Sequence, residues 1–284
     1  DGVFGLWYGK GPGVDRSGDV FKHANLAGTS KFGGVLVAMG DDHSAESSTE
    51  LHQSEYALVD AMMPILSPAG VQDILDFGIF GWALSRYSGL WVGIKCLKDT
   101  IEVTEVVDAS HDRIKLENVS DNKDPQLNIR LGDTPPARED RMHNKKVDAA
   151  KKFTRLNNIN RVVLNPKKRS FGIISSGKSW LDTVHALDLL GIDEKEAANL
   201  EITTFKVGMV WPLDEVAISD WATGLERILV VEEKRNLIEG QLKEILYQLK
   251  ERPEVIGHKD ASGAILLPSN GVLDPIMVAK AISE

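Results

Sequence analysis

The stretch GGVLVAMGDDHSAESS, residues 33–48, joins a continuous apolar run to a polar segment. Continuous apolar runs are typical of parallel strands that are covered on both faces, and ligands collect where such strands end. Strand-like runs recur along the chain at residues 3–8, 90–97, 170–177, 202–214 and 227–234. Because segments with helical character separate these runs, parallel βαβ units and an α/β fold are expected.

Helices are expected at residues 17–26, 49–62, 68–87, 137–159, 179–192, 236–249 and 274–284. Ser67 would be the N-cap of the helix that begins at Pro68. After Asp108 the chain becomes polar and lacks the patterns of a buried strand or an extended helix. We therefore expect a first domain at 1–107, a linker with an amphipathic helix at 108–168, and a second domain at 169–284.

The composition excludes several classes of protein. A net charge of −9 argues against a general nucleic-acid-binding surface, which needs a basic face. The single cysteine, Cys96, excludes an intrachain disulfide and a cysteine-ligated iron–sulfur cluster within the chain. No apolar run has the length of a bilayer span, so a cytoplasmic protein without membrane attachment is expected. The chain lacks an initiating methionine and opens on a strand, so we expect that it starts part-way through a larger protein.

The glycine-rich segment YGKGPGVDRSGD, residues 8–19, is the first candidate for a site. Glycine-rich turns between a strand and a helix can bind phosphate or line a cleft, but they also occur wherever a backbone turns tightly. The segment matches neither the Walker A pattern nor the dinucleotide pattern GxGxxG. A cleft-lining role and a purely structural turn therefore both remain open.

The polar segment at residues 40–48 is the second candidate. Asp41 and Asp42 could bind a metal or position a substrate amine, and His43 could act as an acid, a base or a hydrogen-bond donor near neutral pH. The alternative is a helix start, with Ser48 or Thr49 as the N-cap and the acids near the positive end of the helix dipole.

Three further features carry weaker signals. SSGKS, residues 175–179, resembles the end of a phosphate loop but lacks the upstream glycine, so a plain turn is favoured. Glu232 and Glu233 end a strand, where a solvated or helix-capping role is commoner than a catalytic one. The histidines other than His43 show no metal-ligand spacing, so we expect them in packing or surface positions and predict no metal site.

The residues also resemble a known family, the large fused indolepyruvate ferredoxin oxidoreductases of bacteria. These are thiamine-diphosphate-dependent 2-oxoacid:ferredoxin oxidoreductases. The resemblance in the first half lies in GLWYGKGPGVDRSGDVFKHANLAGTS (5–30), MGDDHSAESSTELHQSE (39–55) and GLWVGIKCLKDT (89–100). In the second half, FGIISSGKSWLDTVHALDLLGI (171–192), FKVGMVWPLD (205–214) and ILVVEEKRNLIEGQLKEIL (228–246) resemble the transketolase C-terminal-like domain of the same enzymes.

This resemblance implies two three-layer units with parallel sheets. The first would be the C-terminal part of a pyrimidine-binding domain for thiamine diphosphate, and the second a transketolase C-terminal-like domain. The implied roles are cofactor binding for Gly11, Pro12 and Gly13, substrate binding for Asp41, Asp42, Ser47 and Ser48, and catalysis for His43. No residue here matches the family's glutamate that hydrogen-bonds the aminopyrimidine ring, its magnesium motif or its cluster cysteines.

The implied activity is oxidative decarboxylation of an aryl 2-oxoacid such as indolepyruvate, with thiamine diphosphate, magnesium, coenzyme A and ferredoxin. The iron–sulfur clusters and the remaining domains or subunits would lie elsewhere in the enzyme. The isolated chain is expected to be inactive, to bind no cofactor alone and to form a homo-oligomer. A non-catalytic docking or scaffold module is the alternative.

Overall fold

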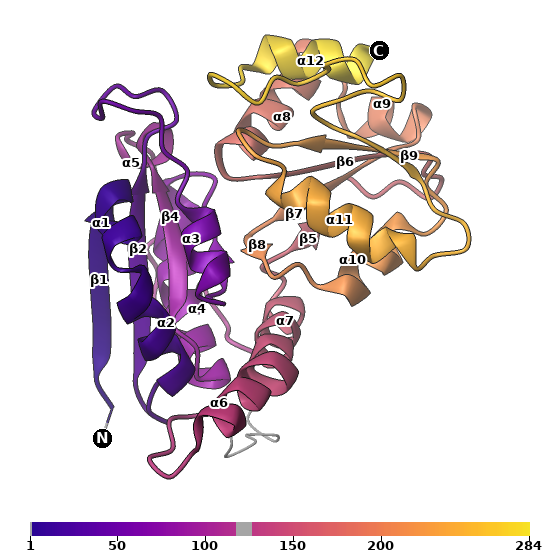
Figure 1. Ribbon diagram of the computed structural model, residues 1–284. Coiled ribbons are helices and arrows are strands. Elements are labelled where there is room, and N and C mark those ends of the chain that lie inside the picture. Colours follow the sequence, from indigo (N-terminus) through magenta and orange to yellow (C-terminus); the bar gives the residue numbers. More distant parts are fainter. Residues whose placement is uncertain (1, 118–126) are drawn as a thin grey trace. The chain divides into compact units, whose positions relative to one another are not determined.

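The computed structural model describes residues 2–117 and 127–284. The chain separates into two compact units, Asp1–Asn158 and Ile159–Glu284. Each unit is built on its own sheet with helices around it (Figure 1). Within the described residues, no helix is long and apolar enough to cross a membrane.

The sheet of the first unit has the strand order β1-β2-β4-β3, and its neighbouring strands pair in parallel. The strands are β1 (Phe4–Lys10), β2 (Gly34–Asp41), β3 (Ile65–Leu66) and β4 (Val92–Leu97). The helices of the unit are α1 (Gly11–Arg16), α2 (Gly18–Ala27), α3 (Glu55–Asp60), α4 (Val71–Ser88), α5 (Lys98–Ile101), α6 (Pro135–Arg141) and α7 (Val147–Leu156). A π-helical turn, Met142–Lys146, joins α6 to α7.

Helix α4 covers one face of this sheet at close range. A Cβ atom at Gly81 would come within 2.6 Å of the Leu36 side chain, so glycine permits the approach of helix and strand. The apolar run in β2 supplies Leu36 and Val37, adjacent residues whose side chains point to opposite faces of the sheet and are 3% and 0% exposed. The continuous apolar pattern of the sequence thus becomes a strand covered from both sides, as expected for a parallel sheet.

In the second unit the strand order is β10-β9-β6-β7-β5, parallel except for the antiparallel β5. The strands are β5 (Arg161–Val162), β6 (Phe171–Ser176), β7 (Ile202–Val207), β9 (Arg227–Val231) and β10 (Glu254–Ile256), and β8 (Met209–Trp211) follows β7. The helices are α8 (Gly177–Leu189), α9 (Glu194–Asn199), α10 (Glu215–Ala222), α11 (Leu237–Tyr247) and α12 (Pro275–Ser283). The core between sheet and helices includes Ile173, Leu229 and Val278.

An ion-pair network lies where β6 and β9 end. Lys178 Nζ is 2.7 Å from Asp182 Oδ2 and 3.1 Å from Glu233 Oε1, and it donates to the Leu273 carbonyl at 2.7 Å. Burial lowers the pKa of Lys178, but the two carboxylates outweigh burial and hold this pKa above its ordinary value. The lysine of SSGKS, Lys178, therefore forms its ion pairs with carboxylates of the same unit.

Three expected elements differ from the structure. The segment at residues 8–19 is not a flexible loop, because β1 runs to Lys10 and α1 begins directly at Gly11. The helix expected at 49–62 is limited to Glu55–Asp60, because hydrogen bonds to Asp41 and Asp42 hold the preceding residues in a non-helical path. Helix α4 begins at Val71 rather than Pro68; the Asp73 carboxylate accepts the Ala69 amide there, and Ser67 does not cap the helix.

The helical segment α6–α7 lies on α4 within the first unit, where Tyr87 and Phe153 stack with ring centroids 5.7 Å apart. The segment buries Lys146 completely, and the ammonium reaches the Gly89 carbonyl at 3.4 Å. Burial, with a further contribution from the charge of Arg141, lowers the pKa of Lys146 to about 8. The charged lysine is therefore a cost to the folded state.

We expect Lys146→Met to stabilise the first unit. Between the folded pKa of about 8 and the ordinary value of 10.5, the unfolded chain binds a proton that the folded chain lacks, so the free energy of unfolding rises with pH across this window. In the methionine variant the free energy of unfolding should no longer rise with pH across this window. Near neutral pH this free energy should exceed that of the unsubstituted chain by up to about 3 kcal/mol. Thermal melts on either side of the window measure both effects. The exposed Lys115→Met serves as the control, and an unchanged pH slope in Lys146→Met would contradict the assignment.

Candidate active site

A buried cluster of charged side chains lies where β2 and β4 end. Lys95, on β4, is 8% exposed, and its ammonium contacts Glu55 at the start of α3, His43 after β2, and Asp41. The Nζ atom lies 3.0 Å from His43 Nε2 and 3.8 Å from Asp41 Oδ2, and it forms an ion pair with Glu55 Oε1. All four side chains are buried, so the interactions act in a medium of low polarity.

Ser54 holds Asp41 in place. The Ser54 hydroxyl donates to Asp41 Oδ1 at 2.6 Å, and the Ser54 amide lies 3.1 and 3.0 Å from the two carboxylate oxygens. These hydrogen bonds orient the carboxylate toward the segment that leads into α3. Asp41 therefore organises the cluster from the end of its strand.

His52 extends the network toward α1. Its Nδ1 is 3.4 Å from Asp41 Oδ1 and 3.1 Å from the Ser54 hydroxyl, and its Nε2 is 3.1 Å from Asp15 Oδ2. A Cβ atom at Gly11 would come within 2.1 Å of His52 Nδ1. Glycine is therefore needed at residue 11 because the imidazole ring occupies the space that a side chain would fill.

Asp42 has a different role from its neighbour. Its carboxylate accepts the Ser47 amide at 2.7 Å and the Glu46 amide at 3.2 Å, along with the hydroxyls of Ser44 and Ser47. Burial raises the pKa of Asp42, but these hydrogen bonds outweigh burial and hold this pKa below its ordinary value. Asp42 fixes the conformation of the polar segment.

Five of the eight residues singled out from the sequence fall into three groups. Asp41 and His43 lie in the charged cluster, Asp42 and Ser47 form the turn beside it, and Gly11 packs on His52. Pro12 is exposed and Gly13 is half-buried in α1. A Cβ atom at Gly13 would lie 3.8 Å from the Trp7 ring. Ser48 is half-buried in the polar segment. Their predicted binding roles stay predictions.

Sequence reasoning missed Lys95 and Glu55, which carry most of the charge of the cluster. A lysine in the otherwise apolar run LWVGIKCL was the available signal, because a buried ammonium requires anionic partners. Glu55, at 6% exposed, gave no such signal, because an acid in the first turn of a helix is ordinary on the surface. Cys96 is next to Lys95, but burial and the charge of Asp41 raise the pKa of its thiol, so it is a poor nucleophile.

The cluster has a defined charge and defined hydrogen-bonding atoms. One ammonium faces two carboxylates, so the formal charge of Lys95, Asp41 and Glu55 together is negative. An ammonium only donates, so His43 Nε2 accepts from Lys95 and the ring hydrogen belongs on Nδ1. Glu55 Oε2 is buried and has no hydrogen-bond partner in the described chain. The site therefore presents a carboxylate oxygen that can accept a hydrogen bond from a ligand.

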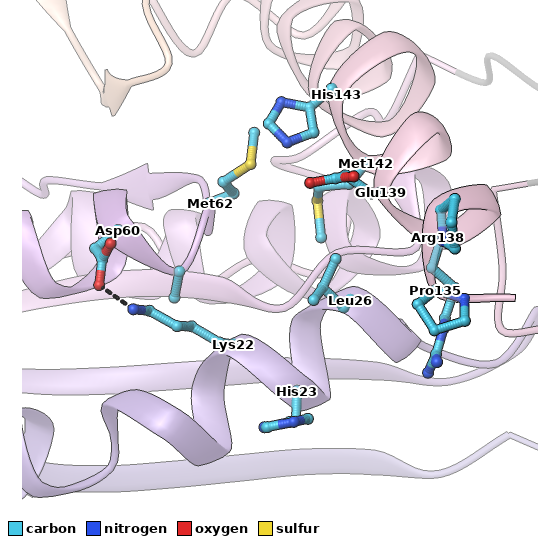
Figure 2. A pocket seen from close by; sticks show the side chains of 12 residues that line it. Lys22, His23, Leu26, Asp60, Met62, Pro135, Arg138, Glu139, Met142 and His143 are labelled. Atoms are coloured by element: carbon cyan, nitrogen blue, oxygen red, sulfur yellow. Dashed lines mark ion pairs between the residues drawn. The ribbon is translucent and has the colours of Figure 1, made fainter.

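A separate pocket of about 580 Å³ lies between α2, the end of α3 and the α6–π-helix segment. Figure 2 shows Met62 and Met142 at this pocket, with Lys22 paired to Asp60 at one side. Met62 has a left-handed backbone (φ 55), and Met142 begins the π-helical turn. The volume of this pocket is in the range of small-molecule pockets, about 300–1,000 Å³. The charged cluster at the ends of β2 and β4 does not line it.

Comparison with known proteins relates both halves of the chain to one group of enzymes. Residues 161–284 match the family model described as the indolepyruvate oxidoreductase domain. The chain is 25% identical over 99% of its length to "Indolepyruvate oxidoreductase subunit IorA" of Methanothermobacter thermautotrophicus, covering 43% of that protein. It is 26% identical to the protein of the same name from Pyrococcus horikoshii, over 81% of the chain and 35% of that protein. The chain thus spans less than half the length of these relatives.

Solved structures share the fold of the chain. A 2-oxoglutarate:ferredoxin oxidoreductase from Magnetococcus marinus matches with a TM-score of 0.62 at 15% identity, over 98% of this chain and 52% of that one. A split-gene transketolase, described as an inactive beta4 tetramer, matches with a TM-score of 0.51 at 15% identity, over 99% of this chain and 74% of that one. The expected α/β fold with two units is confirmed, and the relationship to 2-oxoacid oxidoreductases is supported.

We expect Gly11→Ala to destabilise the first unit. The added methyl group would collide with the His52 ring, and overpacking of this kind costs about 1–3 kcal/mol. Gly13→Ala in the same helix is the matched control, because its nearest neighbour is at 3.8 Å and alanine is the better helix former. Chemical denaturation measures both changes. Equal stability of the two variants would contradict the proposed contact between Gly11 and His52.

Proposed function

We propose that the chain is part of an enzyme that oxidatively decarboxylates an aryl 2-oxoacid such as indolepyruvate. Coenzyme A would accept the acyl group and ferredoxin the electrons, while the iron–sulfur clusters would lie in the remaining domains or subunits. The observation that carries the proposal is the similarity of nearly the whole chain to indolepyruvate oxidoreductase subunits, together with the family match in the second unit. A bacterial origin, a fused arrangement of domains and a cytoplasmic location remain predictions.

The described residues suit one part of thiamine diphosphate. The unpartnered Oε2 of Glu55 is a buried acceptor of the kind that an amino group or a protonated ring nitrogen can use. The diphosphate needs magnesium with several oxygen ligands. No group of three or more possible ligands lies near the Asp41 cluster in the described residues. We therefore propose that the chain supplies one wall of the cofactor cleft and that the diphosphate is held elsewhere; when bound, the cofactor supplies the electron sink for decarboxylation.

The charge of the cluster restricts which part of a ligand it can face. Asp41 and Glu55 outnumber Lys95, so the cluster favours a ring with N–H donors or positive charge and disfavours a bare carboxylate. In this proposal Glu55 accepts a hydrogen bond, Lys95 forms an ion pair with Glu55, and Asp41 with Ser54 positions Lys95. His43 positions the ammonium through Nε2.

We expect His43→Ala, made in the complete enzyme, to lower kcat/KM for indolepyruvate about tenfold or more, the usual size of a lost acid–base or positioning contact. The rate of indolepyruvate oxidation with an artificial electron acceptor, measured over a range of indolepyruvate concentrations, gives kcat/KM. His111→Ala, at an exposed position of the same unit, is the control. An unchanged kcat/KM in a folded His43→Ala enzyme would remove His43 from the site, and absence of 2-oxoacid oxidation in the unsubstituted enzyme would refute the proposed function.

A docking or scaffold module that forms homo-oligomers is the second candidate. Strand β1 is at the end of its sheet and exposes Phe4, Leu6 and Tyr8 at 52%, 57% and 80%. Apolar side chains on an edge strand favour association with another chain. The similarity in fold to a transketolase described as an inactive tetramer is consistent with this candidate. Light scattering at micromolar concentration tests it, since a strict monomer would argue against a covered β1.

A further inference from the structure

Three side chains that can bind a metal meet at the carboxyl ends of β9 and β10 in the second unit. Glu232 follows β9, Glu239 lies in the first turn of α11, and His258 follows β10 by two residues. Each offers one ligand atom, and these atoms all lie within 4.8 Å of one another. The group thus combines two carboxylates with an imidazole from three separate segments of the chain.

The hydrogen bond of His258 to Leu267 determines which ring nitrogen carries the hydrogen. Its Nδ1 lies 3.0 Å from the Leu267 carbonyl, and because a carbonyl only accepts, Nδ1 carries the hydrogen. Nε2 therefore presents a lone pair. This atom is buried and has no hydrogen-bond partner in the described chain. Donation from Nδ1–H to a carbonyl while Nε2 points at a ligand is the usual arrangement of a metal-binding histidine.

The two carboxylates are buried and held in fixed orientations. Glu232 is 7% exposed and accepts the amides of Ile238 and Glu239 at 2.8 and 2.9 Å, while Glu239 is 5% exposed and accepts the His258 amide at 3.3 Å. Glu239 also pairs with Lys243, which is half-exposed and can turn toward solvent. Two buried carboxylates so close together repel each other, and a bound cation would relieve that repulsion.

We propose that Glu232, Glu239 and His258 bind a divalent transition-metal ion of the zinc type. Two carboxylates and a neutral imidazole neutralise the charge of such an ion, and an imidazole ligand favours zinc over magnesium or calcium. The ion would join the end of β9, the start of α11 and the segment after β10, which makes its role structural. This proposal does not depend on the proposed 2-oxoacid oxidoreductase activity.

To test this proposal, the purified chain is first freed of metal with a chelator. Calorimetric titration with Zn²⁺ then measures the binding affinity, and metal analysis measures the number of Zn²⁺ ions bound per chain. We expect one Zn²⁺ per chain at this group, a higher Tm with the ion bound, and binding at least about tenfold tighter than that of Mg²⁺. His258→Gln and Glu239→Gln should each weaken Zn²⁺ binding at least about tenfold, the usual effect of losing a ligand or its support. His185→Gln and Glu244→Gln, both exposed in the second unit, are the matched controls.

Absence of stoichiometric Zn²⁺, or equal binding by His258→Gln and the unsubstituted chain, would overturn the proposal. Tighter binding of Mg²⁺ than of Zn²⁺ would also overturn it. If the ligand variants fail to fold, nitrogen NMR of the unsubstituted chain decides. Zn²⁺ should shift the His258 Nε2 resonance while Nδ1 keeps its proton, and an unchanged His258 spectrum would exclude the site.

Discussion

The burial of Lys95 in a parallel strand is the constraint on which the candidate active site depends. An ammonium that is 8% exposed requires anionic partners, because an unpaired buried charge costs several kcal/mol. Asp41 and Glu55 meet that requirement from the next strand and from a helix start, and Ser54 holds Asp41 at 2.6 Å. The path of the polar segment between β2 and α3 follows from these contacts.

The second unit also pairs a lysine with two carboxylates at the ends of its strands. Lys178 is paired with Asp182 and Glu233 where β6 and β9 end, and its pKa is raised although burial opposes this. In both units, ionisable groups gather at the carboxyl edge of a parallel sheet. Strand ends and helix starts bring backbone donors to this edge, so carboxylates can be buried there at lower cost than elsewhere in the core.

The two carboxylate groups of the chain differ in what balances them. In the first unit a lysine lies between Asp41 and Glu55, leaving one oxygen of Glu55 without a partner. In the second unit Glu232 and Glu239 face a histidine nitrogen that only accepts. The first arrangement suits a ligand that donates hydrogen bonds, whereas the second suits a metal ion. The chemistry at the two edges is therefore distinct even though the sheets are similar.

The sequence alone determined the alternation of strands and helices, because runs such as residues 33–39 have one apolar pattern whatever surrounds them. It also pointed to Asp41, Asp42 and His43, since acids and a histidine after a buried strand lie at the ligand edge. The tertiary structure decided which of these share a cluster: Asp41 and His43 meet Lys95, while Asp42 holds its own turn. Glu55, Lys95 and His258 acquire their roles from partners distant in sequence. The local pattern at Lys95 indicates only that a buried ammonium needs anionic partners, and it does not identify them.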